Sequence, residues 1–311
     1  MSATTNSTGL AAWAHRDTAP EKRWETERGC VRSTSRSDWR ERHTEVVSPR
    51  LGIRGCCGWS FGHSRAPGAV PRCALAALLA AGWLCFSEEN SGFARRAEQN
   101  YREARTRYQS NSNDAEAAWQ FGRACFDWAD FAKSDEQRES VASEGIAACR
   151  QLIAREPKSA AGHYYLAMDL GQVAQTKTLG ALKIVQEMER EFKTSRDLDA
   201  NFDYGGPDRN LGLLYLEAPG WPASIGSKSN ARKHLERAVE LAPDYPENRL
   251  CLLEAYLKWG DRKNLQRELK ATEELLPRAR KEFAGEAWAQ SWADWDKRWK
   301  KIQEKARELR R

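Results

Sequence analysis

The titratable residues of this chain are not arranged as a catalytic site. Three of its five histidines, His15, His43 and His63, lie in the first 68 residues. His163 and His234 stand singly in helical sequence, where a packed or surface histidine is far commoner than a general base. Active sites gather several titratable groups in matched roles, and residues 69–311 carry no GxSxG, HExxH or P-loop motif. We therefore predict a protein that is not an enzyme and uses no cofactor or metal.

The remaining carboxylates and thiols of interest favour structural roles. Asp203 and Asp208 flank a Gly-Gly-Pro turn, where capping or salt bridges explain them better than a catalytic carboxylate pair. Cys125, Cys149 and Cys251 fall in helical segments without CxxC or Cys/His zinc spacing. We expect buried, reduced thiols, with a Cys125–Cys149 disulfide as the alternative after export.

A binding groove is the kind of site that the residue pattern favours. Its aromatic and apolar walls with two arginines suit an amphipathic ligand that bears a carboxylate, or an acidic peptide, because the Arg fork pairs with planar carboxylates. The alternative is that several of these side chains pack against the following helix. The candidates share inner-facing positions on successive helices: Trp119, Arg123, Phe126, Tyr164, Met168, Arg209, Leu213, Leu216, Leu250 and Leu257.

The elements that would position this groove are helices in a repeat. From Ser91 onward, apolar residues recur at helical spacing and are interrupted by Pro and Gly. Pro243 and Pro277 lie about 34 residues apart, the length of a tetratricopeptide unit, and each is expected to end a helix. Leu211-Gly212-x-x-Tyr215 matches the first-helix signature, in which Gly lets two helices approach closely. Four units are recognisable, which predicts an all-α, tetratricopeptide-like array of antiparallel helix pairs over residues 92–277.

The residues after the array, 278–311, predict one further helix. Trp288, Trp292, Trp295, Trp299 and Ile302 follow one another at spacings of 4, 3, 4 and 3, which places them on one stripe. Such a stripe favours a charged helix that caps the last repeat. A platform for an aromatic ligand is the alternative.

The amino-terminal part differs in composition from the array. Residues 1–68 show no periodicity and are expected to be disordered or a mis-extended start. Residues 1–72 carry 12 of the 50 Lys and Arg but 7 of the 44 Asp and Glu, so the rest is nearly neutral and has no basic face for nucleic acid. Residues 69–87 contain the apolar run Cys73–Phe86, which fits a secretory signal. A buried helix and an uncleaved membrane anchor are the alternatives.

One segment carries a family resemblance. Residues 198–260 include the pattern G-P-x-R-x-L-G-x-L-Y, from Gly206 to Tyr215, followed by the loop Pro219-Gly-Trp-Pro222. This segment resembles the T-component family of TRAP transporters, and the likeness extends from Ala94 to about Pro277. The resemblance implies an exported bacterial tetratricopeptide protein that works with a periplasmic substrate-binding protein. Members are often lipid-anchored, but here Leu84 stands before Cys85, where a lipobox has a small residue.

These observations combine into one functional prediction with two alternatives. The preferred function is a non-catalytic, periplasmic accessory of a TRAP-type solute uptake system, which binds the substrate-binding subunit and a hydrophobic organic acid. The first alternative is a general exported tetratricopeptide scaffold for protein assembly with no transport role. The second is a cytoplasmic scaffold, if residues 1–68 belong to the native chain. The sequence leaves the ligand and the oligomeric state open.

Overall fold

The computed structural model describes residues 76–177, 181–220 and 223–309, with side chains from residue 92 onward. All of them belong to one compact unit. Residues 1–68, expected to be disordered, lie outside the described residues, as do residues 69–75 and Trp221-Pro222. The described elements are α2 (Ala76–Ser110), α3 (Ala115–Ala129), α4 (Asp135–Arg155), α5 (Ala160–Thr176), α6 (Ala181–Leu198), α7 (Phe202–Glu217), α8 (Lys228–Leu241), α9 (Pro246–Trp259), α10 (Arg262–Glu282), a short 3-10 helix (Glu286–Trp288) and α11 (Ala289–Glu308).

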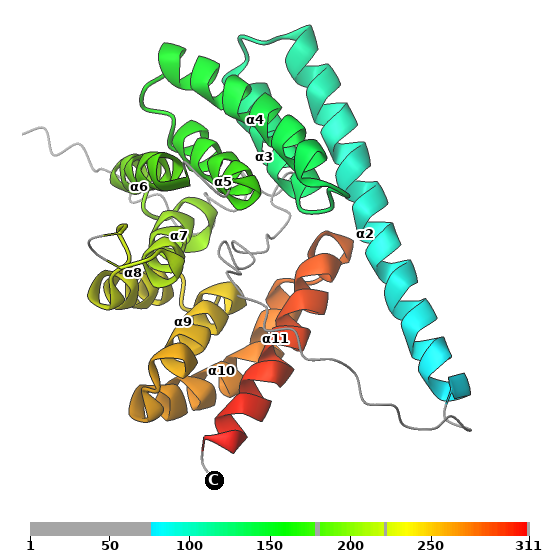
Figure 1. Ribbon diagram of the computed structural model, residues 1–311, viewed down its shortest axis with the longest axis vertical. Coiled ribbons are helices and arrows are strands. Elements are labelled where there is room, and N and C mark those ends of the chain that lie inside the picture. The colour runs from blue at the N-terminus through cyan, green and yellow to red at the C-terminus, as the bar shows by residue number, and fades with distance from the viewer. Residues whose placement is uncertain (1–75, 178–180, 221–222, 310–311) are drawn as a thin grey trace, which may run out of the picture. The chain divides into compact units, whose positions relative to one another are not determined.

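Eight of these helices form the four predicted pairs. Helix α3 packs on α4, α5 on α6, α7 on α8 and α9 on α10, and the second helix of each pair also contacts the first helix of the next (Figure 1). The first helices contact one another in turn, α3 with α5, α5 with α7, and α7 with α9. We call α3, α5, α7 and α9 the inner row. This arrangement confirms the all-α, tetratricopeptide-like fold class.

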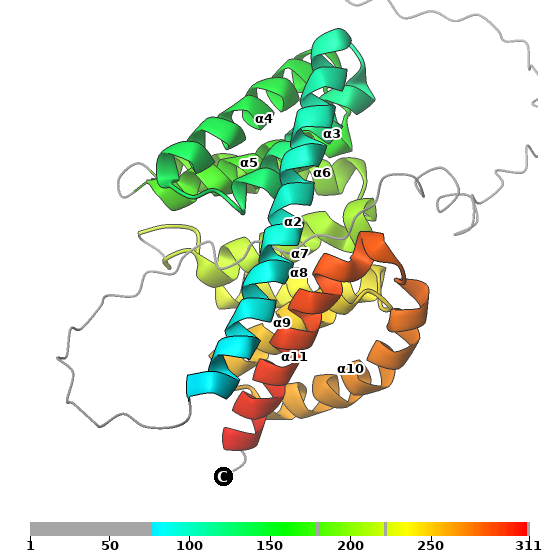
Figure 2. The ribbon, with the colours of Figure 1, turned by 90° about the vertical axis from the view of Figure 1, so that its right-hand side faces the viewer.

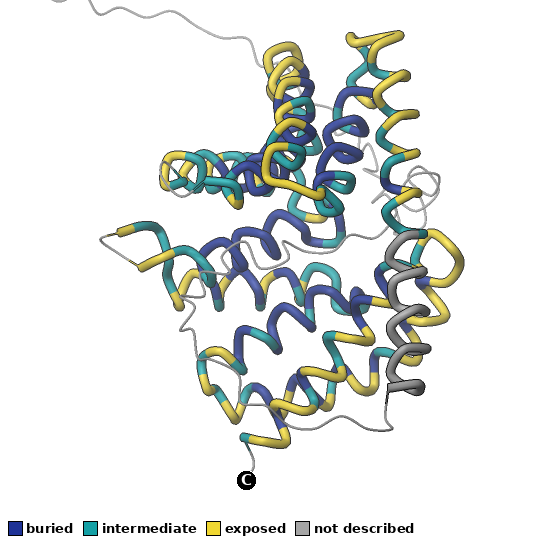
Figure 3. The backbone as a smooth tube through the Cα atoms, turned by 45° about the vertical axis from the view of Figure 1, so that its right-hand side comes forward, coloured by how far each residue is buried: buried dark blue, intermediate teal, exposed yellow. Residues whose placement is uncertain are grey.

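The inner row is more deeply buried than the second helices. The tube coloured by burial shows α5 and α7 as almost continuously buried, whereas the second helices keep an exposed face (Figure 3). Close packing within a pair depends on glycine. A Cβ on Gly212 of α7 would lie 2.6 Å from Leu235 Cγ of α8, and one on Gly122 of α3 would lie 2.4 Å from Cys149 Sγ of α4. The predicted role of Gly212 in close helix approach is therefore confirmed.

Gly212→Ala is expected to lower the free energy of unfolding by about 1–3 kcal/mol, because α7 and α8 must move apart to admit the methyl group. Gly92→Ala is the matched control, since a Cβ there meets nothing within 4 Å. That variant is expected to gain up to about 1 kcal/mol from helix propensity. Equilibrium urea unfolding measures both changes, and equal effects would contradict the packing argument.

Polar caps and prolines set most of the helix boundaries. The side chains of Ser134, Ser159, Ser227 and Asp261 accept hydrogen bonds from the first turns of α4, α5, α8 and α10. Pro243 lies between α8 and α9, as predicted.

The prediction that Pro277 ends a helix is wrong. Pro277 lies inside α10, which continues to Glu282. Proline removes one backbone hydrogen bond. The flanking residues Leu275, Ala279 and Phe283 are all buried in the core, and this packing offsets the loss. The expected boundary between residues 277 and 278 therefore falls within a helix.

Helix α11 follows the last pair and caps the array by packing on α9 (Figure 2). Trp292, Trp295 and Ile302 of the predicted stripe are buried in the same core cluster as α9, and Trp288 and Trp299 pack against that cluster. The predicted capping role is confirmed, although the helix begins at Ala289.

Helix α2 runs without a break from Ala76 to Ser110 and packs on α3. It therefore passes through the boundaries expected at residues 87 and 92. None of the helices in the described residues combines the length and hydropathy that a bilayer crossing requires.

Candidate functional site

The start of α7 contains an unusual turn in the inner row. Asp203, Tyr204 and Gly205 have φ values of 49°, 58° and 76°, so two consecutive non-glycine residues take the left-handed conformation. That conformation costs roughly 1–2 kcal/mol for each such residue. The predicted turn at the Gly pair is thus present, and the regular part of α7 follows it, with Pro207 near its first position.

Buried side chains from three helix pairs hold this turn in place. The Asp203 carboxylate accepts hydrogen bonds from Tyr164 Oη and from Arg209 Nη2, both at 2.6 Å. Asn210 Nδ2 donates to Tyr164 Oη at 2.8 Å, and Arg209 Nη1 donates to Asn248 Oδ1 at 3.0 Å. Asn248 in turn donates to the carbonyl oxygen of Tyr204 at 2.9 Å. We call these five side chains, Tyr164, Asp203, Arg209, Asn210 and Asn248, the inter-unit polar cluster.

This cluster fixes the angle between successive units rather than offering an open site. Arg209 is 1% exposed and Asp203 is 8% exposed, so both charges are withdrawn from solvent. Gly206 lets the turn approach α5, because a Cβ there would lie 2.7 Å from Tyr164 Oη. Burial raises the pKa of Tyr164 well above its usual range, and the neighbouring Asp203 charge adds to the shift. The tyrosine therefore acts as a neutral hydrogen-bond donor.

The ten predicted groove residues all lie on the inner row, but most are covered by protein atoms. Three of them meet at the polar cluster, since Asn210 donates to both Tyr164 and Met168, and Arg209 also donates to Tyr164. The two arginines are already paired, Arg209 with Asp203 and Arg123 with Asp127 at 3.9 Å. Contact of this set with a partner stays a prediction. The buried members are Arg123, Phe126, Tyr164, Met168, Arg209, Leu213 and Leu250, and the half-buried members are Trp119, Leu216 and Leu257.

An aromatic cluster forms a partly accessible stretch of the inner row. Trp119 of α3 stacks on Tyr165 of α5 with 5.7 Å between ring centroids and an interplanar angle of 11°. Phe202 of α7 meets Trp119 edge-on at 6.4 Å and Tyr164 at 5.1 Å. Trp119 and Phe202 are half-buried, so the cluster is not wholly covered by protein atoms. We call Trp119, Tyr164, Tyr165 and Phe202 the inner aromatic cluster.

The isolated titratable residues have structural partners, as expected. His163 contacts Glu191 through Nδ1 at 2.6 Å, and this hydrogen bond raises its pKa although burial opposes the shift. His234 contacts Asp208 at 2.7 Å, so Asp203 and Asp208 both form ion pairs or hydrogen bonds within the fold.

The three cysteines of the array, Cys125, Cys149 and Cys251, are free and buried, as predicted. Burial raises the pKa of each thiol, which opposes thiolate chemistry. No group of three or more His, Cys, Asp or Glu side chains in the described part of the chain could hold a metal ion.

Several residues of these sites were missed from the sequence. Asn210 and Asn248 are fully buried amides, yet each stands beside other polar residues near the start of its helix and gives no local signal. Phe202 precedes the Gly-Gly-Pro turn, and only the folded turn brings it to Trp119. A polar pocket beside α8 was also missed, because its lining comes from three helices and leaves no pattern in any one of them.

The four pairs, the inner row and the capping helix define a tetratricopeptide-like helical repeat protein. Residues 87–190, about one third of the chain, match the family described as RMD1-3, regulator of microtubule dynamics protein 1-3. No curated protein matches the chain. Among solved structures, a thermophilic TPR protein of Thermus thermophilus is similar, with 16% identity and a TM-score of 0.48, over 69% of this chain and 98% of that one.

Proposed function

We propose that this protein is a non-catalytic adaptor that binds a protein partner through the inner aromatic cluster. The observation that carries the proposal is the pair of half-buried rings, Trp119 and Phe202, which come from helices of two different units. Aromatic side chains that keep one accessible face supply much of the binding energy at protein interfaces. The polar cluster beneath them holds α5, α7 and α9 in one geometry, so the surface is formed before the partner arrives.

We propose further that the protein is exported and serves a TRAP-type solute uptake system. The residues that carry the family resemblance, from Gly206 to Tyr215, directly follow the turn. They supply Arg209 and Asn210 to the polar cluster and include Gly212 of the close α7–α8 contact. The partner would then be a periplasmic substrate-binding protein, and a hydrophobic organic acid would lie against the aromatic rings. Signal-sequence chemistry in residues 69–87 supports export. A scaffold without a transport role remains the alternative.

A different partner follows if the match of residues 87–190 reflects function. The name of that family concerns microtubule dynamics, and a cytoplasmic scaffold that binds tubulin would use α2 to α6. The two proposals predict different captured proteins and different mature amino termini.

Trp119→Ala is expected to weaken capture of the native partner by about tenfold or more, because truncation of an interface tryptophan typically removes about 2 kcal/mol or more. The full-length protein is used as bait in native-host extract, with added purified tubulin in a parallel sample. Trp299→Ala is the matched control, since Trp299 is also half-buried but lies on α11. Circular dichroism checks that both variants fold.

The outcomes separate the proposals. Capture of a substrate-binding protein and a mature chain that begins after Cys85 support the transport role. Capture of tubulin by a chain that retains its first 68 residues overturns it. Equal binding by wild type, Trp119→Ala and Trp299→Ala contradicts the assignment of the inner aromatic cluster.

A further inference from the structure

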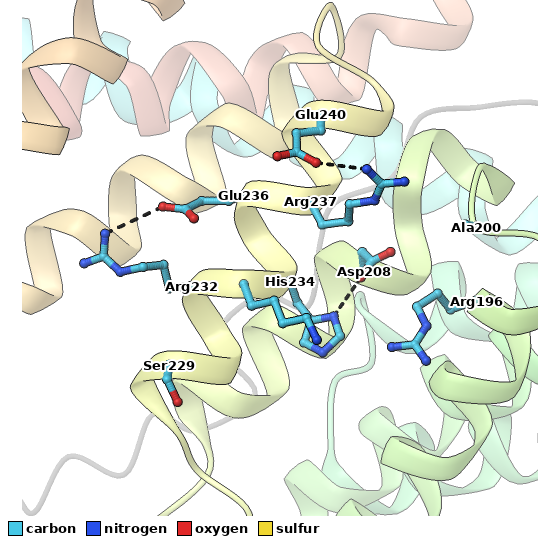
Figure 4. Close-up of a pocket in the computed structure, with 10 residues that line it drawn as sticks. Arg196, Ala200, Asp208, Ser229, Arg232, His234, Glu236, Arg237 and Glu240 are labelled. Atoms are coloured by element: carbon cyan, nitrogen blue, oxygen red, sulfur yellow. Dashed lines mark hydrogen bonds and ion pairs between the residues drawn. The ribbon is translucent and has the colours of Figure 1, made fainter.

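A polar pocket of about 620 Å³ lies beside α8, and none of its lining residues belongs to the inner aromatic cluster. Its lining comes from the exposed face of α8, the carboxyl end of α6 and the first half of α7 (Figure 4). Small-molecule sites in proteins have volumes of roughly 300–1,000 Å³. The pocket is therefore large enough for a small metabolite, and its chemistry is set by charged side chains.

Two of the four basic side chains of the lining are already neutralised. Arg232 pairs with Glu236 at 3.6 Å and with Asp261 at 2.7 Å. Asp261 lies outside the pocket. Arg237 pairs with Glu240 at 2.9 Å. These pairs form part of the wall and leave little charge for a ligand.

The other two basic side chains keep charge available to a ligand. Lys233 is exposed and forms no ion pair with the residues that the structure describes. Within the same part of the chain, Arg196 pairs only with its neighbour Asp197, at 2.7 Å, and that carboxylate is 67% exposed. An exposed pair of this kind contributes little energy, so an anion in the pocket can compete for the guanidinium.

Two buried side chains, Asp208 and His234, form the floor of the pocket between Arg196 and Lys233. Asp208 is 3% exposed and accepts a hydrogen bond from His234 Nδ1 at 2.7 Å. The imidazole is further held by stacking on Tyr215, with 5.6 Å between ring centroids. Because the carboxylate occupies Nδ1, the other ring nitrogen, Nε2, is left for the pocket. Figure 4 shows the Arg196 guanidinium directed toward the His234 ring.

We propose that this pocket binds a small molecule with an anionic group, a carboxylate or a phosphate, held by Arg196 and Lys233 beside His234 Nε2. The guanidinium provides a planar fork for two parallel hydrogen bonds, and the ammonium adds a mobile positive charge. The ion-paired rim of Arg237 and Glu240 offers hydrogen bonds to the polar remainder of the ligand. This site does not depend on the partner surface proposed above, because none of its residues belongs to the inner aromatic cluster.

The test is a titration of the full-length protein with succinate, inorganic phosphate and sodium chloride at matched ionic strength. Long-range ¹H–¹⁵N spectra follow the Nε2 resonance of His234, and isothermal titration calorimetry gives the affinity. We expect saturable binding of succinate or phosphate in the millimolar range, with a shift of the His234 signal and with weaker binding at higher salt. Which of the two probes binds identifies the anionic group.

The variants separate a specific site from general attraction of anions. Arg196→Ala combined with Lys233→Ala is expected to weaken binding by about tenfold or more. The matched control removes two other exposed charges from the same helices, Arg190 of α6 and Lys228 of α8, each changed to Ala. Equal weakening by both double variants, or no saturable binding of either probe, overturns the proposal. The substituted side chains of the test variant reach the surface, so folding is preserved.

Discussion

Replacing Glu247 by alanine is expected to lower the free energy of unfolding by about 3 kcal/mol and to release α11 from the array. Glu247 lies in the first turn of α9 and is fully buried. Its carboxylate accepts hydrogen bonds from Trp295 Nε1 at 2.7 Å and from Arg298 Nη1 at 2.6 Å, both on α11. The alanine variant leaves the indole N–H without its acceptor in the core. The loss lies at the lower end of the range for a broken buried pair, because Arg298 keeps two hydrogen bonds to Glu254.

The charge state of Glu247 gives this contact a pH dependence. Burial disfavours the carboxylate, but the positive charges of Arg298 and Arg209 and the hydrogen bonds from Arg298 and Trp295 outweigh it and lower the pKa. A carboxyl whose pKa is lower in the folded state contributes stability that is complete above its ordinary pKa, near about 4.3. That stability is lost as the pH falls through the lowered value. The wild-type α11 should therefore remain docked at neutral pH and detach only in acid.

Hydrogen exchange of residues 289–308 measures docking of α11 directly, and urea unfolding gives the stability. Glu247→Ala should lose protection in this segment at neutral pH, whereas Glu254→Gln should retain it, because the Glu254 side chain is 40% exposed. Glu247→Gln should lie between the two, since the amide oxygen can still accept from Trp295. Unchanged protection in Glu247→Ala would show that the Trp292 and Ile302 contacts alone hold the helix.

The repeat fold could be predicted because its determinants are local. Helical periodicity, capping residues and the Gly212 signature each act within one or two turns of chain, and the four pairs follow from them. The capping role of α11 was visible for the same reason, since its tryptophan spacing defines one face. The prediction that Pro277 ends a helix was wrong because the burial of its neighbours, a tertiary effect, outweighs the missing backbone hydrogen bond.

The candidate site was only half predictable, because side-chain direction on the inner row is set by the turn before α7. The positions of Trp119, Tyr164 and Arg209 on inner helices were correct. The spacing of residues in the sequence could not predict how exposed these side chains are. The left-handed turn at Asp203–Gly205 places Asp203 where it forms an ion pair with Arg209. The pocket beside α8 depends on Arg196, which comes from the preceding unit. The periodicity of the sequence does not predict that Arg196 lies close to α8.

Asp203→Ala is expected to lower the free energy of unfolding by about 3–5 kcal/mol, because it leaves the Arg209 guanidinium buried without its counter-ion. Tyr164 Oη loses its acceptor in the same variant. Asp203→Asn separates charge from conformation. Asparagine tolerates the left-handed backbone at this position and still offers one acceptor oxygen. The free energy of unfolding should therefore fall by less, about 3 kcal/mol, and this loss measures the cost of leaving the Arg209 charge unpaired.

A double-mutant cycle tests whether charge pairing is the cause. Adding Arg209→Met to Asp203→Asn removes the stranded cation, so the double variant should be more stable than the sum of the single losses predicts, by at least about 1 kcal/mol. Asp208→Asn is the matched control, since Asp208 is also buried but contacts the imidazole of His234 instead of a guanidinium. Its loss should be only about 1 kcal/mol. Additive losses at Asp203 and Arg209 would mean that the turn is held by the Asn248 and Tyr164 contacts, and that the ion pair only fills space between the units.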